Sequence, residues 1–193
     1  MRCLMCERFS LWHICTTCQK NLLSPTLHKR VILDSIPVYS FYPYDAIESL
    51  LLTKHTDIGF YIYKILANNS LKAFSQAWQY KNKVASLGVD DTSKSGYSHT
   101  AVLNSSLKSH NIIPHYGKIR ATAEYKYAGK TLEERVQNPR KFSYSPFKEE
   151  EVILVDDIVT TGSTLSEAVE LLHQKGKQVI LCLTLSDAQN RMV

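Results

Sequence analysis

The sequence predicts an α/β protein with a doubly wound, mostly parallel sheet and a small N-terminal module. Residues 152–155 form an apolar run without alternation, which suits a central parallel strand buried on both faces. A helical pattern over 165–175 and a second apolar run over 179–185 follow it. This order is a strand–helix–strand unit, whose crossover should be right-handed. Two closely spaced cysteine pairs mark the module.

Length and composition bound the organisation of the chain. With 193 residues and 44% hydrophobic content, it can form one α/β core plus the small module. We expect a boundary near Ser24 and Pro25, with residues 1–24 as the module and 25–193 as the main domain. No apolar run approaches membrane-spanning length, and the first residues lack a signal-peptide core. We therefore expect a cytoplasmic protein without membrane insertion.

The N-terminal module carries two CxxC pairs separated by eight residues: Cys3, Cys6, Cys15 and Cys18. Four thiolates can close around one Zn²⁺ at tetrahedral geometry, and they leave no open position for catalysis. Disulfides are the alternative, but a reducing compartment disfavours them. The sequence thus predicts a structural zinc finger. We expect His13 to be solvated and Cys182, in the last apolar run, to be an inert core residue.

Between the module and the first apolar run, the pattern predicts two strands and two helices. Extended runs over 31–33 and 36–42 flank an Asp34-Ser35 turn, and a helical pattern runs from Asp45 to Lys54. A second helix is expected over residues 58–78. It contains five aromatic residues, which we expect in the core or at a domain contact rather than in a base-stacking platform: Phe60, Tyr61, Tyr63, Phe74 and Trp78.

Two carboxylates and a hydroxylated loop follow the strand at 152–155. Ligands of open α/β sheets bind at the carboxyl ends of strands, and a helix N-terminus favours an anion. Paired carboxylates suit the vicinal hydroxyls of a ribose and attract Mg²⁺. The sequence therefore predicts a sugar-phosphate site. Its candidate residues are Asp156, Asp157, Ile158, Val159, Thr160, Thr161, Gly162, Ser163 and Thr164.

Local signals also set the bounds of the helix after this loop. Thr164 and Glu167 have the spacing of a capping box, and Gly176 suits the end of the helix. A plain strand-to-helix turn with Asp and Thr as caps is the alternative to a sugar-phosphate site. A P-loop is excluded because no Gly-Lys-Ser/Thr ending is present.

The string VILVDDIVTTGSTL resembles the phosphoribosyl-pyrophosphate (PRPP) binding motif of type I phosphoribosyltransferases. The resemblance implies a phosphoribosyltransferase-like fold with PRPP and Mg²⁺ as ligands. It also implies that Asp156 and Asp157 bind the ribose hydroxyls, while residues 160–164 bind the 5′-phosphate.

The positive charge is concentrated in one segment. The chain has a net charge of +5, and residues 107–148 hold nine Lys or Arg and three Glu. Aromatic residues are interleaved with these cations, which suits single-stranded nucleic acid. An ordinary solvated loop and contacts to the pyrophosphate of PRPP are the alternatives. The nucleic-acid candidates are Lys108, Lys118, Arg120, Lys126, Lys130, Arg135, Arg140 and Lys141.

A four-Cys module joined to a phosphoribosyltransferase-like domain resembles the ComF (ComFC) family of DNA-uptake competence proteins. Arg135 and Asn138 fit the RxxN spacing of that family, and Tyr42, Tyr44 and Lys54 fit its early segment. The resemblance implies a role in natural transformation that handles single-stranded DNA beside a helicase-like translocase. Such a partner could bring the chain to the inner face of the membrane.

The middle of the chain departs from that family. Residues 86–100 lack the expected arginines that help grip pyrophosphate, and Lys94 is a weak substitute. His99 and His115 are acid or base candidates only by residue type. The sequence thus supports PRPP binding by a competence protein more than PRPP transfer. The alternatives are an active phosphoribosyltransferase with an unknown acceptor and a non-catalytic PRPP-sensing regulator.

Overall fold

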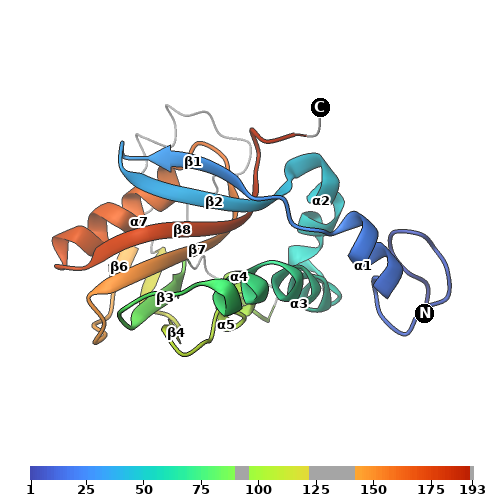
Figure 1. The fold of residues 1–193 in the computed structure, drawn as a ribbon, viewed down its shortest axis with the longest axis horizontal. Coiled ribbons are helices and arrows are strands. Elements are labelled where there is room, and N and C mark those ends of the chain that lie inside the picture. The colour runs from blue at the N-terminus through green and yellow to red at the C-terminus, as the bar shows by residue number, and fades with distance from the viewer. Residues whose placement is uncertain (90–95, 122–141, 192–193) are drawn as a thin grey trace.

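The computed structural model describes residues 1–89, 96–121 and 142–191, and a six-stranded sheet forms its centre (Figure 1). The strand order is β1-β2-β8-β7-β3-β4, and all neighbours are parallel except β1 and β2. The predicted mostly parallel α/β fold is confirmed. The strands are β1 (His28–Ile32), β2 (Ile36–Pro43), β3 (Val84–Gly88), β4 (Ile112–His115), β7 (Glu151–Val159) and β8 (Gln178–Asp187).

Helices cover both faces of the sheet. On one face α7 (Ser163–Gln174) packs on Val152 and Leu154 of β7. On the other face, Ile153 and Val155 belong to a core shared with the remaining large helices. Both faces of β7 are therefore buried, which explains its apolar run. These helices are α2 (Tyr44–Leu51), α3 (Gly59–Asn69), α4 (Leu71–Ala77) and α5 (His99–Ser105), and α1 (Thr16–Leu22) lies at the N-terminal end.

A second, two-stranded sheet lies beside the main one. It consists of β5 (Ile119–Ala121) and β6 (Phe142–Tyr144), which pair antiparallel. The outer strand of the main sheet on this side is β4, whose third residue is Pro114. None of the helices in residues 1–89, 96–121 and 142–191 has the length and apolar character needed to cross a membrane.

The two helices predicted between residues 45 and 78 are divided differently in the structure. The first ends as α2 at Leu51 and continues as a 3₁₀-helix, η1 (Leu52–His55). The second is broken at Ser70, between α3 and α4, where φ is −114° and ψ is −77°. Ser70 Oγ donates to the carbonyl of Leu66 at 2.7 Å. Such side-chain bonding to the backbone competes with helix propagation, so the prediction of one helix was wrong.

The turn between β1 and β2 spans residues 33–35, which includes the predicted Asp34 and Ser35. Leu33 and Asp34 have φ values of 48° and 58°, and the N–H of Ser35 donates to the carbonyl of Ile32 at 3.3 Å. Two successive residues with positive φ give a type I′ turn, which matches the twist of a hairpin. The hairpin thus places β1 at the edge of the sheet.

The start of α7 also differs from the sequence prediction. The helix begins at Ser163, and Gly162 occupies the N-cap with φ 87° and no side-chain cap hydrogen bond. Thr164 is therefore inside the helix, and the predicted capping box does not begin it. At the other end, Gly176 follows the last helical residues with φ 72°, as the sequence predicted.

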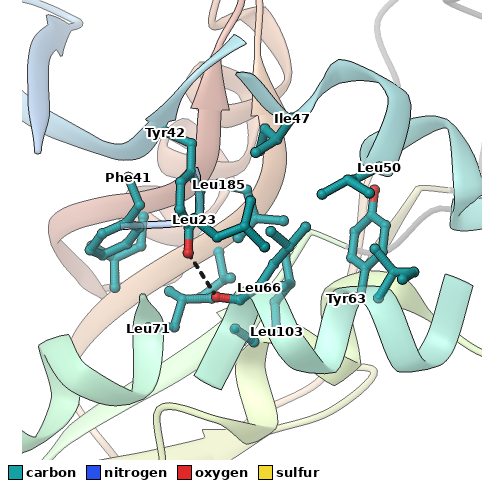
Figure 2. Close-up of a cluster of buried hydrophobic side chains, with 14 of the residues drawn as sticks. Leu23, Phe41, Tyr42, Ile47, Leu50, Tyr63, Leu66, Leu71, Leu103 and Leu185 are labelled. Carbon is teal, nitrogen blue, oxygen red and sulfur yellow. Dashed lines mark hydrogen bonds between the residues drawn. The ribbon is translucent and has the colours of Figure 1, made fainter. Parts of the chain in front are cut away.

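The core between the sheet and α2, α3 and α5 extends into the N-terminal module. Leu23 lies among the side chains of Tyr42, Leu66 and Leu185 (Figure 2). The hydroxyl of Tyr42 donates to the carbonyl of Leu66 at 3.3 Å. Cys3, Ile14 and Cys18 belong to the same buried cluster. The module therefore shares its hydrophobic core with the main domain, and the boundary near Ser24 stays a prediction.

The aromatic residues predicted in the core divide into two groups. Tyr63 is fully buried, and Phe74 and Trp78 pack against the core as partly buried residues. Phe60 and Tyr61 are exposed, at 37% and 53% of their surface. These two residues therefore lie outside the core, and the stacking of Tyr61 on His13 of the N-terminal module, with centroids 4.9 Å apart, fits the domain contact that the sequence predicted as the alternative.

Candidate functional site

The loop after β7 forms a small cavity at the carboxyl end of the sheet. The cavity has a volume of about 20 Å³, room for about one water-sized group such as an oxygen atom of an anion. The residues around it come from the end of β7, the β7–α7 loop and the first turn of α7. They are Asp156, Ile158, Val159, Thr160, Gly162, Ser163, Thr164 and Leu165.

The N-terminus of α7 supplies the electrostatics of this cavity. The first backbone N–H groups of a helix have no intrahelical partner, and the macrodipole places about +0.5 charge there. The N–H of Ser163 lies 3.3 Å from Thr161 Oγ1, and the two hydroxyls lie 3.0 Å apart. These bonds within the loop hold Thr161 at the N-terminus of α7, where the helix dipole favours an anion.

Arg30 holds this loop from the hairpin. Its Nη1 atom donates to the carbonyl of Thr160 at 2.8 Å and lies 3.3 Å from both carboxylate oxygens of Asp187. A Cβ atom added to Gly162 would lie 3.0 Å from Arg30 Nη2, so glycine leaves room for the guanidinium. Arg30 was not among the residues predicted from the sequence. The signal in the sequence was the acid Asp187 at the end of the last apolar run, because a carboxylate that is buried there needs a donor.

The two adjacent carboxylates of β7 point to different surroundings. Asp156 lines the cavity beside α7, and one of its oxygens accepts the N–H of Asp157 at 2.8 Å. Asp157 is buried, 5% exposed, and faces the helices on the other side of the sheet. The predicted pair therefore does not present two equivalent carboxylates to one cavity.

Three side chains contact the carboxylate of Asp157. Lys54 Nζ lies 2.9 Å, the hydroxyl of Tyr63 3.2 Å and His99 Nε2 3.6 Å from Oδ2. Burial alone would raise the pKa of Asp157, but the charges of His99 and Lys54 and the hydrogen bonds with Lys54 and Asp156 outweigh burial and lower the pKa to about 2. Asp157 therefore anchors two cationic side chains beside the sheet.

The backbone around Lys54 is in close contact with Tyr97 and Gly59. The hydroxyl of Tyr97 donates to the carbonyl of Lys54 at 2.9 Å. A Cβ added to Gly59 would overlap both this hydroxyl and the carbonyl of Thr53. Glycine at position 59 is thus needed for the close approach of η1, α3 and Tyr97.

The basic segment is only partly within the described residues. Lys108 and Arg120 are exposed, whereas Lys118 Nζ donates to the carbonyl of Pro146 at 2.7 Å. His115 pairs with Glu149, with 2.7 Å between Nε2 and Oε2. The remaining residues of interest lie outside the described part of the chain: Lys94, Lys126, Lys130, Arg135, Asn138, Arg140 and Lys141.

The four N-terminal cysteines converge on one point. Their Sγ atoms lie within 4.8 Å of one another, and the Cys6 and Cys15 sulfurs are 3.7 Å apart. A tetrahedral Zn²⁺ with bonds of about 2.3 Å needs sulfurs about 3.8 Å apart, so the geometry fits zinc. All four are free thiols, which is the outcome expected of a metal site rather than disulfides.

Backbone N–H groups favour the thiolate form of Cys3, whereas burial raises the pKa of Cys18 to about 12. The N–H of Cys15 donates to Cys3 Sγ at 3.2 Å, and the N–H of Cys18 donates to Cys15 Sγ at 3.4 Å. Burial would raise the pKa of Cys3, but its backbone donors lower the pKa to about 6. Cys182, in contrast, is fully buried in the α7 core, and burial raises its pKa. It is a core residue, as predicted.

Comparison with known proteins agrees with this arrangement. The "Phosphoribosyl transferase domain" family model matches residues 79–192. No curated protein matches the sequence. Among solved structures, a Staphylococcus aureus hypoxanthine phosphoribosyltransferase is 16% identical, with a TM-score of 0.42 and coverage of 68% of this chain and 66% of that chain.

Two further solved structures share the same low level of similarity. An orotate phosphoribosyltransferase from Aeropyrum pernix is 17% identical, with a TM-score of 0.41 and coverage of 89% of this chain and 80% of that one. The Saccharomyces cerevisiae adenine phosphoribosyltransferase is 17% identical, with a TM-score of 0.43 and coverage of 88% and 87%. The family match spans more than half of the sequence and includes β7, the β7–α7 loop and α7. The chain therefore belongs to the phosphoribosyl transferase domain family.

Proposed function

We propose that this protein binds PRPP, with the 5′-phosphate at the β7–α7 loop. The observation that supports this most directly is the cavity between Asp156 and the first turn of α7. Backbone N–H groups, the hydroxyls of Thr160, Ser163 and Thr164 around the cavity, and the helix dipole can all stabilise a phosphate there.

In this proposal the two carboxylates act differently. Asp156 lines the cavity and binds the ribose hydroxyls or a Mg²⁺ ion that accompanies the pyrophosphate. Asp157 contributes by holding Lys54 and His99, which bring positive charge to this edge of the sheet. These two cations are candidates to meet the pyrophosphate, since arginines are missing from residues 86–100.

Calorimetric titration of the zinc-loaded chain with PRPP and Mg²⁺ tests the site. Asp156→Asn keeps the size of the side chain and removes its charge, so we expect PRPP affinity to fall by at least about tenfold. Glu170→Gln, on the exposed side of α7, is the matched control and should bind like the native chain. Absence of PRPP binding in the folded native chain would refute the proposal.

Catalysis is a separate question from binding. If the protein transfers the phosphoribosyl group, pyrophosphate release should require Mg²⁺ and an added acceptor. A panel of nucleobases and nucleic acids is the direct assay. Binding of PRPP without release of pyrophosphate in any of these reactions would instead favour the PRPP-sensing regulator.

We further propose that the protein acts in DNA uptake, in the cytoplasm and with single-stranded DNA as its macromolecular ligand. The support is the combination of a four-Cys site with the phosphoribosyl transferase domain, which resembles the ComF family, together with the local positive charge of residues 107–148. Affinity for an oligonucleotide should fall as salt rises, because phosphate contacts release counterions. Salt-independent affinity would contradict this role. A helicase-like translocase is the expected protein partner.

A further inference from the structure

The N-terminal module and α3 expose large aromatic side chains. Phe9 is 86% exposed and Trp12 is 62% exposed, both in the loop between the two cysteine pairs. Tyr61 and Phe60, at the start of α3, are 53% and 37% exposed. Side chains of this size are normally buried or used in binding, so their exposure on two adjoining elements suggests a shared ligand.

Ring contacts join these elements into one surface. His13 stacks on Tyr61, with centroids 4.9 Å apart and an interplanar angle of 16°. Phe60 meets Tyr61 edge to face at 5.4 Å and meets Tyr97 in the same way at 5.9 Å. His13 is therefore a structural contact rather than the solvated bystander that the sequence suggested. We call the aromatic row these four contacting rings together with the two exposed rings of the loop that contains His13: Phe9, Trp12, His13, Tyr61, Phe60 and Tyr97.

The aromatic row ends beside the proposed PRPP site. Tyr97 donates to the backbone of Lys54, and Lys54 pairs with Asp157. Asp156, the next residue along β7, lines the cavity. A chain-like ligand that follows the row from the cysteine module would thus arrive at the edge of the sheet where the ribose phosphate is expected.

Cations lie along the same surface. The guanidinium of Arg2 lies 5.4 Å from the ring centre of Phe9, and Lys64 Nζ lies 5.9 Å from that of Phe60. Residues 1–24 contain Arg2, Arg8 and Lys20 against the single acid Glu7. Aromatic rings can stack on the bases of a nucleic acid, and the cations between them can contact its phosphates.

We propose that the aromatic row is a stacking platform for single-stranded nucleic acid, which rests on the DNA-handling part of the proposed function. Bases stack on Trp12 and on the ring system around Tyr61, while Arg2 and Lys64 contact the backbone phosphates. The strand is thereby aligned from the cysteine module toward Lys54. This adds a second DNA-contacting surface to the basic segment of residues 107–148.

Binding of a fluorescein-labelled oligothymidylate to the zinc-loaded chain, followed by anisotropy, tests the platform. Trp12→Leu and Tyr61→Leu keep an apolar side chain and remove the π-face, so each should weaken binding about tenfold. Val31→Ala, which removes exposed apolar surface on β1, is the matched control and should leave the affinity unchanged.

Tryptophan fluorescence gives an independent readout. The chain has two tryptophans, and Trp78 is partly buried and stacked on Tyr80 with centroids 4.7 Å apart. Quenching by an unlabelled oligonucleotide should therefore come from Trp12 and disappear in Trp12→Leu. Unchanged PRPP binding in both leucine variants would show that the fold is intact.

The contrary outcomes are distinct. If the native chain binds the oligonucleotide and both leucine variants bind it equally well, the platform is refuted while DNA handling stands. If Trp12→Leu abolishes self-association in sedimentation but leaves DNA affinity intact, the row is a protein interface and the proposal is overturned. If the native chain binds PRPP but no oligonucleotide, the DNA part of the proposed function fails together with this inference.

Discussion

The carboxylate of Asp157 is expected to make the free energy of unfolding depend on pH in the acid range. Its pKa is lowered to about 2 in the folded chain, so its contribution to stability is present above about pH 4 and is lost as the pH falls toward 2. We expect Asp157→Asn to lower the free energy of unfolding by about 2–3 kcal/mol at pH 7. This is less than the loss expected for a fully buried ion pair, because Lys54 is 29% exposed. Urea unfolding of both chains measures this difference.

The pH dependence of that difference identifies its cause. The gap between native and Asp157→Asn chains should be present at about pH 5 and shrink below about pH 4. Comparing the two chains at each pH cancels acid effects on the cysteine site that they share. Glu170→Gln, on the exposed side of α7, is the control and should show no such gap, and a gap that persists at about pH 2 would exclude the ion pair as its origin.

Arg30 is expected to act through the β7–α7 loop. Its planar guanidinium reaches both the carbonyl of Thr160 and Asp187, and a lysine ammonium cannot reproduce that fork. We expect Arg30→Lys to lower PRPP affinity by about tenfold with a small change in melting temperature, since the charge beside Asp187 is kept. Calorimetry and thermal unfolding measure the two effects, and native-like PRPP affinity would remove Arg30 from the site.

Residue-level predictions from the sequence succeeded where the motif is local. The string after residue 152 placed the hydroxylated loop between a strand and a helix, as found, but β7 continues to Val159, so Asp156 and Asp157 lie within the strand rather than after it. The partners of its side chains are not local: Arg30 and Thr160 are 130 residues apart, and Lys54 and Asp157 are 103 apart. Only the folded sheet brings them together, so periodicity could not reveal which carboxylate would be buried.

At the scale of elements, the turn of the β1–β2 hairpin holds a residue in an unfavourable backbone conformation that a substitution could relieve. Leu33 has φ 48°, a conformation that costs a residue with a Cβ about 1–2 kcal/mol. The Asn-Gly pair is preferred in a type I′ turn, so Leu33→Asn combined with Asp34→Gly should stabilise the chain by about 1 kcal/mol. Thermal unfolding measures this gain. Val31→Gly, in the strand before the turn, should instead destabilise, and equal effects would contradict the turn assignment.

Element boundaries were predicted less well than element types. The break at Ser70 was missed because serine is an ordinary residue in a helix and its bond to Leu66 depends on local geometry. The start of α7 was misplaced because Thr164 and Glu167 have the right spacing for a cap, whereas Gly162 takes the cap position by adopting positive φ. In both places backbone conformation overrode a side-chain pattern.

At the scale of the whole molecule, we expect zinc to stabilise the entire chain. Cys3, Ile14, Cys18 and Leu23 lie in the same core as α2 and α3, so loss of the module should expose part of that core. Structural zinc sites contribute about 10–16 kcal/mol to small zinc-finger peptides. We predict one Zn²⁺ per chain by elemental analysis, and a single calorimetric transition whose midpoint falls by more than about 10 °C after chelation.

Two observations together would contradict the prediction of a structural zinc site. Purified chain that contains no zinc and unfolds at the same temperature with and without a chelator would exclude a structural metal. Cys15→Ser removes one ligand and should reproduce the effect of chelation. Cys182→Ser is the matched control, since it changes a cysteine outside the site and should leave the zinc content at one per chain.

The global fold was predicted because buried parallel strands have a strong sequence signature, but the shared core was not. The sequence suggested a module separated near Ser24, whereas Leu23 reaches the side chains of Tyr42 and Leu66 (Figure 2). Composition gives no sign of such packing, because the residues that make it are ordinary apolar ones. The exposure of Phe60 and Tyr61 was hidden for the same reason.

The proline in β4 has a consequence for solubility at high concentration. An outer strand offers backbone N–H and C=O groups to which a second molecule can add a strand, and this is a common route to aggregation. Pro114 has no N–H to offer and sits in the third of the four positions of β4. Replacing Pro114 with valine would add a backbone N–H donor to β4 and make this edge more prone to pair with a strand of a second molecule. We therefore expect Pro114 to reduce aggregation through the β4 edge of the sheet.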